Sequence, residues 1–480
     1  MNIRPILYVE GLLLSILSIS MAFPMLADMY YGYDDWKVFF VCIIITAFFG
    51  SALVLSNQGM RFNISTREAF ILTNTTWIIL PAFGALPFWL SSLNMSVTDS
   101  FFEAMSGITT TGSTVITGLD HAPTGILLWR AILQWLGGIG IIIMAMSVLP
   151  FLKVGGMQIF KTELAENEKA IPRSSKFASS IAIIYIILTA LCALGYLAAG
   201  LNIFDAIAHA MTTISTGGFS TFDASFDHFK STGPSIVAII FMTLGGIPFV
   251  LYLKAVKSSP FIIIKDTQVR WYLYIIAISA LSMALYLTIT QNISFPKSSY
   301  LSLFNVISIM TGTGYGHSNI GHWGGYAITM FLFLMAIGGC AGSTSCGVKI
   351  FRLQVLYSII KVQVKRLLHP NGVFLPHYNE KPLSKDVPTS VMGFFFVYAL
   401  GFAVLTLALT FVGLDFMTAI SGAMSSISNV GPGLGEIISP IGTYQSLPGS
   451  AKWILCAGMI LGRLELFTIL VMLSPRFWKH

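Results

Sequence analysis

The stretch VISIMTGTGYG, from Val306 to Gly316, begins as an apolar run of helical character and ends in a strand of glycine and threonine. Three further copies read AMSGITTTGST (Ala104 to Thr114), AMTTISTGGFS (Ala210 to Ser220) and AMSSISNVGPG (Ala423 to Gly433). The copies align without gaps on four glycines, which are Gly112, Gly218, Gly314 and Gly431. A motif that recurs at intervals of 96 to 117 residues predicts four structural repeats.

The chain around these motifs is too apolar for a soluble protein. Of its 480 residues, 55% are hydrophobic and only 10% are charged, whereas soluble domains carry about 25% charged residues. Lipid must therefore cover most of the outside, and we expect an all-α integral membrane protein. Ten apolar stretches are long enough for membrane helices. They fall at approximately 5–27, 38–57, 69–92, 125–151, 177–200, 234–256, 270–290, 326–350, 389–412 and 451–474.

The distribution of charge predicts the orientation of the chain. With a cytoplasmic N-terminus, the connections on the cytoplasmic side hold most of the 27 Lys and Arg residues, as is usual for membrane proteins. Both termini are therefore expected in the cytoplasm, and the net charge of +7 indicates topology and not nucleic-acid binding. Two basic connections, Lys153 to Lys176 and Lys349 to Lys385, are long and polar enough to dock a cytoplasmic partner.

The opposite face collects acidic residues, which we expect to raise the cation concentration at an outer mouth. They are Asp28, Asp34, Asp35, Asp99, Glu103, Asp120, Asp205, Asp223, Asp227, Asp415 and Glu436.

Each motif lies between an outgoing and a returning helix. We therefore expect two N-terminal helices followed by four pseudo-fourfold repeats of helix, pore loop and helix around a central pore. The expected boundaries are 1–68 for the two extra helices, then 69–155, 156–260, 261–386 and 387–480 for repeats one to four. Non-helical backbone at membrane depth is tolerated only where it is buried in protein or lines a water-filled path. Gly-rich packing of membrane helices is the alternative, which four aligned copies disfavour.

The Gly/Thr strands have the composition of a cation selectivity filter. In such filters carbonyl oxygens replace the hydration shell of the ion, and the negative C-terminal ends of short helices point toward it. Glycine permits the backbone conformations that this arrangement needs. The expected ion-binding residues are Thr110, Thr111, Gly112, Thr216, Gly217, Gly218, Gly312, Thr313, Gly314, Asn429, Val430 and Gly431.

These motifs resemble the Trk/Ktr/HKT superfamily of potassium transporters, and most closely the Trk-type membrane subunit. The resemblance covers nearly the whole chain, and the two extra N-terminal helices are similar to those of Trk subunits. Glycine at all four aligned positions implies potassium selectivity, with K⁺ as the transported ion and no cofactor in this chain. Ser113, Phe219 and Pro432 stand where the potassium-channel filter TVGYG has tyrosine, so equally strong ion sites are not expected.

The resemblance also implies partners and a location. Trk subunits form homodimers, with one pore in each protomer, in the bacterial inner (plasma) membrane. They dock on a cytoplasmic TrkA-like ring that binds NAD or ATP. This chain carries no nucleotide-binding fingerprint in a soluble context, so control by a nucleotide is expected to come through such a partner.

The returning helix of repeat three contains AIGGCAGSTSCG, from Ala336 to Gly347, which is poor helix-forming sequence. Composition alone leaves two alternatives open, a broken helix that faces a cavity and close packing of helices through small residues. The resemblance favours the first, because Trk-type proteins have an intramembrane loop here that blocks the path below the filter and moves to open it. The expected gate residues are Gly338, Gly339, Gly342, Ser343 and Gly347. Similar small-residue breaks are expected at Gly137-Gly138, Gly245-Gly246 and, more weakly, Gly458 and Gly462.

Arg463 and Glu465 lie in the last apolar stretch, where ionisable groups are costly and usually face the bundle interior. Because arginine keeps its proton, Arg463 needs acceptors. We expect it to contact the repeat-three loop and to add an electrostatic barrier at the gate. Pairing of Arg463 with Glu465 for folding alone is the alternative, which their i, i+2 spacing disfavours. Arg130 is expected to brace the pore helices, and Glu10 to be interfacial or paired.

The predicted function is gated potassium uptake without a chemical step, so the chain is not expected to be an enzyme. Sodium conduction and potassium symport with sodium or protons remain alternatives, because glycines do not distinguish channel-like flux from coupled transport. An intramembrane enzyme is a further alternative. Such an enzyme would need a catalytic group such as paired aspartates at membrane depth. Asp99, Asp205 and Asp415 instead precede the re-entrant segments at their outer ends.

Overall fold

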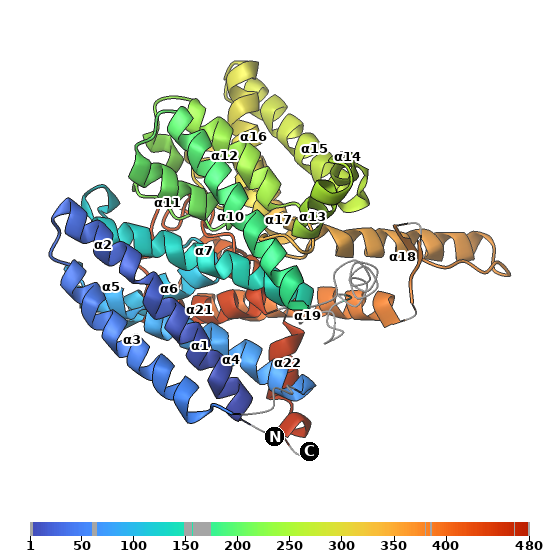
Figure 1. Cartoon of the computed structure of the whole chain (residues 1–480). Coiled ribbons are helices and arrows are strands. Elements are labelled where there is room, and N and C mark those ends of the chain that lie inside the picture. Colours follow the sequence, from blue (N-terminus) through green and yellow to red (C-terminus); the bar gives the residue numbers. More distant parts are fainter. Residues whose placement is uncertain are drawn as a thin grey trace.

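The computed structural model describes residues 3–59, 65–147, 156, 174–379, 381–384, 386–464 and 466–478. Helices make up most of this part of the chain (Figure 1). A short antiparallel hairpin of β1 (His377–Tyr378) and β2 (Lys381–Pro382) is also present. This is the all-α architecture predicted from the composition.

Seven segments of the described chain are helical, long and apolar enough to span a membrane. They are α1 with α2 (Arg4–Ser20 and Ala22–Tyr31), α3 (Trp36–Ser56), α4 with α5 (Thr66–Gly84 and Leu86–Leu90), α7 (Thr124–Ser147), α10 (Ser174–Ala198), α15 (Thr267–Thr290) and α19 (Asp386–Phe411). The end of the predicted stretch 125–151 lies outside the described residues, as does most of the basic connection Lys153 to Lys176.

The other three predicted spans are interrupted, and in two of them the interruption lies at a small-residue break that the sequence predicts. The first consists of α12 (Gly233–Gly245) and α13 (Phe249–Lys257), which meet at 88°. The second is α17 (Gly325–Ile337), which has 13 residues and is followed by a non-helical segment before α18 (Ile350–Leu368). The third is divided into α21 (Gly449–Arg463) and α22 (Phe467–Leu473), and α23 (Pro475–Trp478) follows it.

Two of the four expected small-residue breaks are present. Gly245-Gly246 ends α12, where Pro248 cannot donate to a helical ladder. Gly338, with φ of +74°, ends α17.

The other two expected breaks are wrong, because α7 and α21 run through their glycines as continuous helices. The small size of these residues serves close packing instead. A Cβ on Gly137 would overlap the carbonyl oxygen of Ile108, and a Cβ on Gly462 would overlap that of Ile427.

Each repeat motif begins as a short pore helix, as its apolar run predicts. The four are α6 (Val97–Ile108), α11 (Ile203–Ile214), α16 (Phe295–Thr311) and α20 (Phe416–Ser428). Ser96, Asn202 and Asp415 cap three of them by accepting a backbone N–H of the first turn.

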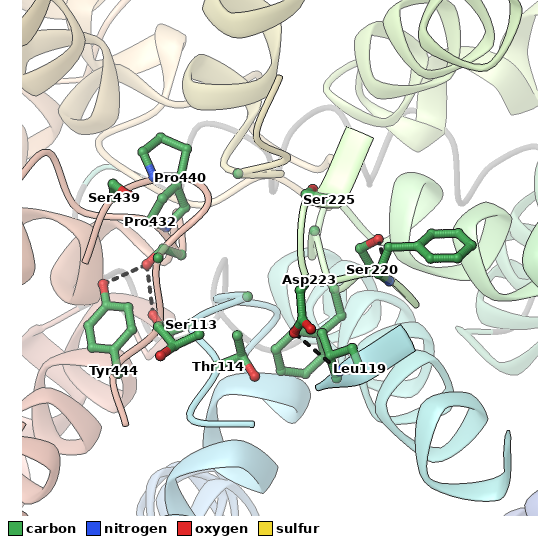
Figure 2. A pocket seen from close by; sticks show the side chains of 18 of the residues that line it. Ser113, Thr114, Leu119, Ser220, Asp223, Ser225, Pro432, Ser439, Pro440 and Tyr444 are labelled. Atoms are coloured by element: carbon green, nitrogen blue, oxygen red, sulfur yellow. Dashed lines mark hydrogen bonds between the residues drawn. The ribbon is translucent and has the colours of Figure 1, made fainter. Parts of the chain in front are cut away.

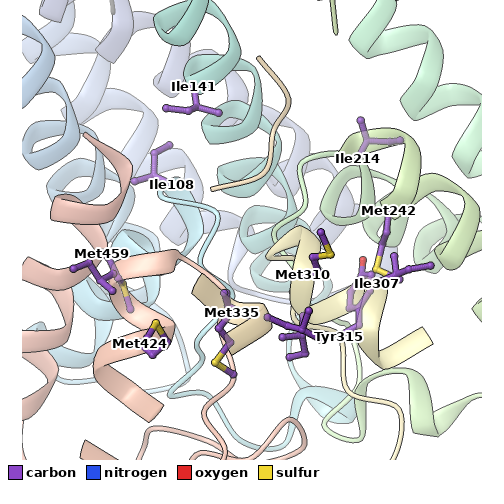
Figure 3. Packing of buried hydrophobic residues seen from close by; sticks show 14 of the residues in the cluster. Ile108, Ile141, Ile214, Met242, Ile307, Met310, Tyr315, Met335, Met424 and Met459 are labelled. Atoms are coloured by element: carbon purple, nitrogen blue, oxygen red, sulfur yellow. The ribbon is translucent and has the colours of Figure 1, made fainter. Parts of the chain in front are cut away.

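The inner ends of the pore helices meet in one apolar cluster, in which Ile108, Ile214, Met310 and Met424 are buried (Figure 3). The core of the molecule therefore surrounds the places where the four motifs leave their helices.

The N-terminal helices pack against the first repeat. Glu10 of α1 accepts hydrogen bonds from Thr75 Oγ1 and Thr76 Oγ1 of α4, at 2.8 and 2.9 Å. Of the two alternatives for Glu10, the paired one is therefore correct.

Candidate ion-conduction site

The four motif strands share an unusual backbone pattern. Their first residues, which are Thr110, Thr216, Gly312 and Asn429, have φ of +51°, +50°, +76° and +52°. Two residues later, Gly112, Gly218, Gly314 and Gly431 have φ of +89°, +78°, +77° and +104°. Residues with a Cβ rarely adopt this left-handed region. The gap-free alignment of the sequence is thus reproduced in the backbone conformation of all four strands.

The strands form a closed ring in the order of the repeats. Each aligned glycine lies so close to its neighbour that an added Cβ would overlap a carbonyl oxygen of the next strand. The overlaps join Gly112 to Gly217, Gly218 to Thr313, Gly314 to Val430, and Gly431 to Thr111. Each contact involves the middle residue of the neighbouring strand, and the fourth strand returns to the first. A side chain at any of these glycines would push a carbonyl out of the ring.

A cavity of about 50 Å³ lies at one end of the ring, which we call the outer end (Figure 2). Its wall includes the four aligned glycines and the residues that follow them in three strands, Ser113, Phe219 and Pro432. Asp223 and Arg130 are the charged residues among those that line it. Asp223 Oδ1 accepts the backbone N–H of Leu119 at 3.1 Å. It is the one residue of the expected acidic mouth that lines this cavity.

The idea that eleven acidic residues gather at the mouth is therefore wrong, because most of them hold the structure together. Asp28 accepts the backbone N–H of Gly125 at the start of α7. Asp99 pairs with Lys452 Nζ at 2.6 Å.

Glu103 and Arg130 form a buried ion pair behind the ring, with Arg130 Nε 2.8 Å from Glu103 Oε1. Arg130 Nη1 also donates to the carbonyl of Ser220 at 2.7 Å, and its guanidinium lies 4.1 Å from the ring centroid of Phe219. Arg130 therefore braces α6 and the second strand, as predicted. Gln134, one turn further along α7, donates to the carbonyl of Gly217 at 2.6 Å and accepts the N–H of Phe219 at 3.0 Å.

Side-chain hydrogen bonds make the outer ends of the strands unequal. The carbonyl of Gly431 accepts hydrogen bonds from Ser113 Oγ at 2.8 Å and Tyr444 Oη at 2.7 Å. In the third strand, the hydroxyl of Tyr315 lies 2.6 Å from Thr212 Oγ1 of the neighbouring pore helix. The strands that lack tyrosine at this position are therefore fixed by other contacts than the strand that has it.

Residues 338–349 form a non-helical loop at the inner end of the ring. The backbone nitrogen of Cys346 lies 4.0 Å from the position of a Cβ on Gly312, the first residue of the third strand. Thr344 Oγ1 lies 3.1 Å from the carbonyl oxygen of Ile214, which ends α11, and 3.0 Å from that of Gly245. Thr344 and Ser345 are fully buried. The loop thus lies against the inner ends of the third strand and of α11. Of the two alternatives, the helix is broken here, since α17 ends at Ile337 and α18 begins at Ile350.

The break between α12 and α13 anchors this loop. Cys340 N donates to the carbonyl of Gly246 at 3.0 Å, and Phe249 N donates to that of Gly342 at 2.9 Å. Of the expected gate residues, Gly338, Gly342 and Gly347 have φ of +74°, +79° and +80°.

The two remaining gate residues close the loop on itself. Gly339 N donates to Ser345 Oγ at 2.8 Å, and Ser343 Oγ donates to the carbonyl of Cys340 at 2.6 Å. Sequence reasoning did not single out Thr344 or Cys346, although both lie in the stretch that predicts the loop.

Arg463 joins the loop to the ring. Its Nη1 donates to Thr110 Oγ1 at 2.8 Å and to Cys346 Sγ at 2.7 Å, and its Nη2 donates to the carbonyl of Gly137 at 2.7 Å. Only 1% of Arg463 is exposed. The expected contact with the loop is present, whereas Glu465, its alternative partner, lies outside the described residues.

Arg463, Cys346 and Lys349 line a second, smaller cavity of about 10 Å³ on the inner side of the loop. In the part of the chain that the structure describes, His, Cys, Asp and Glu side chains form no cluster that could hold a metal ion.

Comparison with known proteins agrees with this geometry. A family model described as "TrkH: Cation transport protein" matches residues 35–480. The Trk system potassium uptake protein TrkI of Halomonas elongata is 39% identical over 478 residues, which are 99% of this chain and 97% of that protein. The Trk system potassium uptake protein TrkH of Vibrio parahaemolyticus is 36% identical over 100% of both chains. The crystal structure of the potassium transporter TrkH from Vibrio parahaemolyticus matches with a TM-score of 0.92 at 35% identity over 100% of both chains. This match confirms the predicted fold.

Proposed function

The chain belongs to the TrkH family of cation transport proteins, a family of transporters and not of enzymes, and from this premise we propose that it takes up potassium through the ring of four strands. One observation carries the proposal. In each of the four strands, the aligned glycine follows two residues after another left-handed residue. Each of these glycines contacts the next strand, and the fourth strand returns to the first. A cycle of this kind surrounds a narrow path with backbone carbonyls, the groups that replace water around a potassium ion.

Potassium enters from the outer cavity beside the carboxylate of Asp223 and loses water in the ring. The proposed binding residues are the twelve predicted from the sequence, from Thr110 to Gly112, Thr216 to Gly218, Gly312 to Gly314 and Asn429 to Gly431. The carbonyl of Gly431 already accepts two hydroxyl hydrogen bonds. We therefore assign the outermost level of the ring a weaker ion site than the levels below it.

The loop from Gly338 to Gly347 is the proposed gate. Its position at the inner end of the ring, its burial and its anchorage at the α12–α13 break support this role. Opening requires that the loop lose the hydrogen bonds of Thr344 and the contact between Arg463 and Cys346. While that contact lasts, the guanidinium lies beside the first filter residue, where its charge opposes the passage of cations.

Membership of the family suggests the location, the topology and the partners of the protein. We propose a multi-pass protein of the bacterial inner membrane with both termini in the cytoplasm, two extra helices (1–68) and four repeats (69–155, 156–260, 261–386 and 387–480). The described chain begins with α1 and finishes with α23 at the same end of the bundle, which supports a common side (Figure 1). A homodimer and a cytoplasmic TrkA-like ring that binds NAD or ATP complete the proposal, since the relatives are named as parts of a Trk system.

Growth and flux test the proposal together. A bacterial strain without its own potassium uptake systems should grow at low potassium only when it expresses this chain, and purified chain in liposomes should pass rubidium faster than sodium. Sodium flux equal to or above rubidium flux would identify a sodium-conducting protein. Rubidium flux that needs an imposed sodium or proton gradient would identify a symporter.

A further inference from the structure

A groove of about 450 Å³ lies away from the ring of motif strands, between the start of α15 and α18. Trp271 of α15, Tyr357, Lys361 and Lys365 of α18, and His377 of β1 contribute to its walls. α18 projects from the bundle beyond the neighbouring helices (Figure 1). Nothing in the conduction pathway accounts for this groove.

Two cations in the groove have no counter-charge. Lys361 and Lys365 are one helical turn apart, so they lie on one face of α18. Neither has a carboxylate partner within the described chain, and the described walls of the groove contain no acidic residue. Asp266, which directly precedes the groove residue Thr267, is occupied because it caps α15 by accepting the N–H of Gln268 at 2.9 Å. Lys365 Nζ lies 5.7 Å from the ring centroid of Phe374, a contact that does not neutralise its charge. A concave surface whose cations lack an acidic partner attracts an anion.

The aromatic residues place the groove at a membrane boundary. Trp271 lies one turn inside the apolar span that starts at Thr267, and its ring packs edge-on against Tyr357 at a centroid distance of 5.5 Å. Tryptophan and tyrosine mark the headgroup level of bilayers, and basic pockets between membrane helices bind acidic headgroups there. On α18 the exposed side chains of Ile360 and Val364 supply apolar surface for acyl chains.

Gln354 forms part of the same groove and adds a requirement on the ligand. It is 8% exposed, and its side-chain oxygen has no hydrogen-bond partner within the described part of the chain. A buried acceptor of this kind is costly unless a donor satisfies it. A ligand that carries both a negative charge and hydroxyl groups would serve the lysines and Gln354 together.

We propose that this groove binds the headgroup of an acidic phospholipid that carries hydroxyl groups, of the phosphatidylglycerol type. The phosphate lies between Lys361 and Lys365, and a headgroup hydroxyl donates to Gln354. α18 begins at Ile350, directly after the loop residue Lys349. The bound lipid therefore restrains the helix on which one end of the proposed gate is fixed. The inference rests on the proposed membrane orientation of the chain only for the choice of the leaflet that supplies the lipid.

Native mass spectrometry of the purified chain tests the proposal. Phosphatidylglycerol should remain bound where phosphatidylcholine does not, and inorganic phosphate should not displace it. Because each basic side chain near a headgroup contributes on the order of 1 kcal/mol, Lys361→Gln with Lys365→Gln should weaken phosphatidylglycerol binding roughly tenfold or more. The control pair Arg67→Gln with Arg476→Gln removes the same charge elsewhere on the same side and should leave the affinity unchanged. Equal elution volumes in gel filtration establish that both pairs are folded.

Three results would overturn the assignment. Equal affinity of both double variants would show that the lysines do not form a site. Displacement of the lipid by inorganic phosphate would make a free anion the ligand. Loss of lipid binding as the chain dimerises would mean that a second copy covers the groove. Since binding is measured without transport, none of these results bears on the proposed filter.

Discussion

Arg463 Nη1 donates a hydrogen bond to Thr110 Oγ1 at 2.8 Å, which fixes a cation to the innermost residue of the first strand of the ring. The same nitrogen lies 2.7 Å from Cys346 Sγ in the loop. One guanidinium therefore holds the loop and the ring together, and a movement of the loop must release or carry this charge.

Replacing Arg463 by glutamine should raise rubidium flux in the absence of any partner. Each charge-assisted hydrogen bond contributes about 1.5–3 kcal/mol, so losing one shifts the balance toward an open loop by about tenfold or more. Flux into liposomes measures the effect. Arg270→Gln, which changes an exposed arginine at the start of α15, is the control and should behave as wild type. If both variants kept the wild-type flux, Arg463 would have no part in the gate.

Thr344→Val should also raise flux, because it removes the hydroxyl contacts with Ile214 and Gly245 but keeps the side-chain shape. At about 1 kcal/mol for a neutral hydrogen bond, the rise should be roughly fivefold. Thr243→Val is the matched control, since the hydroxyl of Thr243 bonds only the carbonyl of Ile239 within α12. A rise of the same size in both variants would point to general destabilisation and against the loop contact.

Breaking the buried pair of Glu103 and Arg130 should destabilise the fold more than changing an exposed pair. Glu103→Gln leaves the Arg130 charge uncompensated, which costs about 3–5 kcal/mol and should appear as a lower midpoint of thermal unfolding in detergent. Asp34→Asn affects the exposed pair with Lys37, which solvent screens, and should leave the midpoint close to that of the wild type. Equal midpoints for the two variants would contradict the bracing role of Arg130.

Gln134→Leu should reduce the preference for rubidium over sodium. The substitution removes the two hydrogen bonds that fix Gly217 and Phe219, and each unsatisfied buried group costs about 1–3 kcal/mol. The second strand should then hold its carbonyls less firmly, and the flux ratio should fall about tenfold. Gln291→Leu, at the exposed end of α15, should leave the ratio unchanged. An unchanged ratio in Gln134→Leu would mean that this contact does not shape the filter.

The left-handed backbone of the four motif strands could be predicted because its requirement is local. A left-handed residue next to a close carbonyl needs glycine wherever the fold places it, so the four copies kept a readable pattern. The helix breaks were harder to predict, because the pairs Gly137-Gly138 and Gly338-Gly339 look alike in sequence. The first pair packs against Ile108 inside a continuous helix. The second pair begins a loop that is held by the α12–α13 break, where Cys340 N donates to the carbonyl of Gly246 and Phe249 N donates to the carbonyl of Gly342.

For contacts between distant parts of the chain, the sequence showed that a buried group needs a partner but not which residue supplies it. The sequence indicated that Arg463 needs acceptors, but Thr110 is 353 residues away from it and Cys346 is 117 residues away. The prediction of an acidic outer mouth was wrong for the same reason, because the partners of these residues are distant in the sequence. The cationic partners of Asp99 and Glu103, which are Lys452 and Arg130, come from returning helices whose packing the sequence does not show.

The rubidium-to-sodium flux ratio of Gly314→Ser, measured in liposomes, tests the central claim most directly. Gly314 has φ of +77°, and an added Cβ would overlap the carbonyl oxygen of Val430. We predict that the ratio falls at least about tenfold, since displacing one carbonyl costs more than about 1.4 kcal/mol. Gly140→Ser, at a helix position with open space around its Cβ, should keep the wild-type ratio. If Gly314→Ser also kept the wild-type rate and ratio, the ring would not be the selectivity filter.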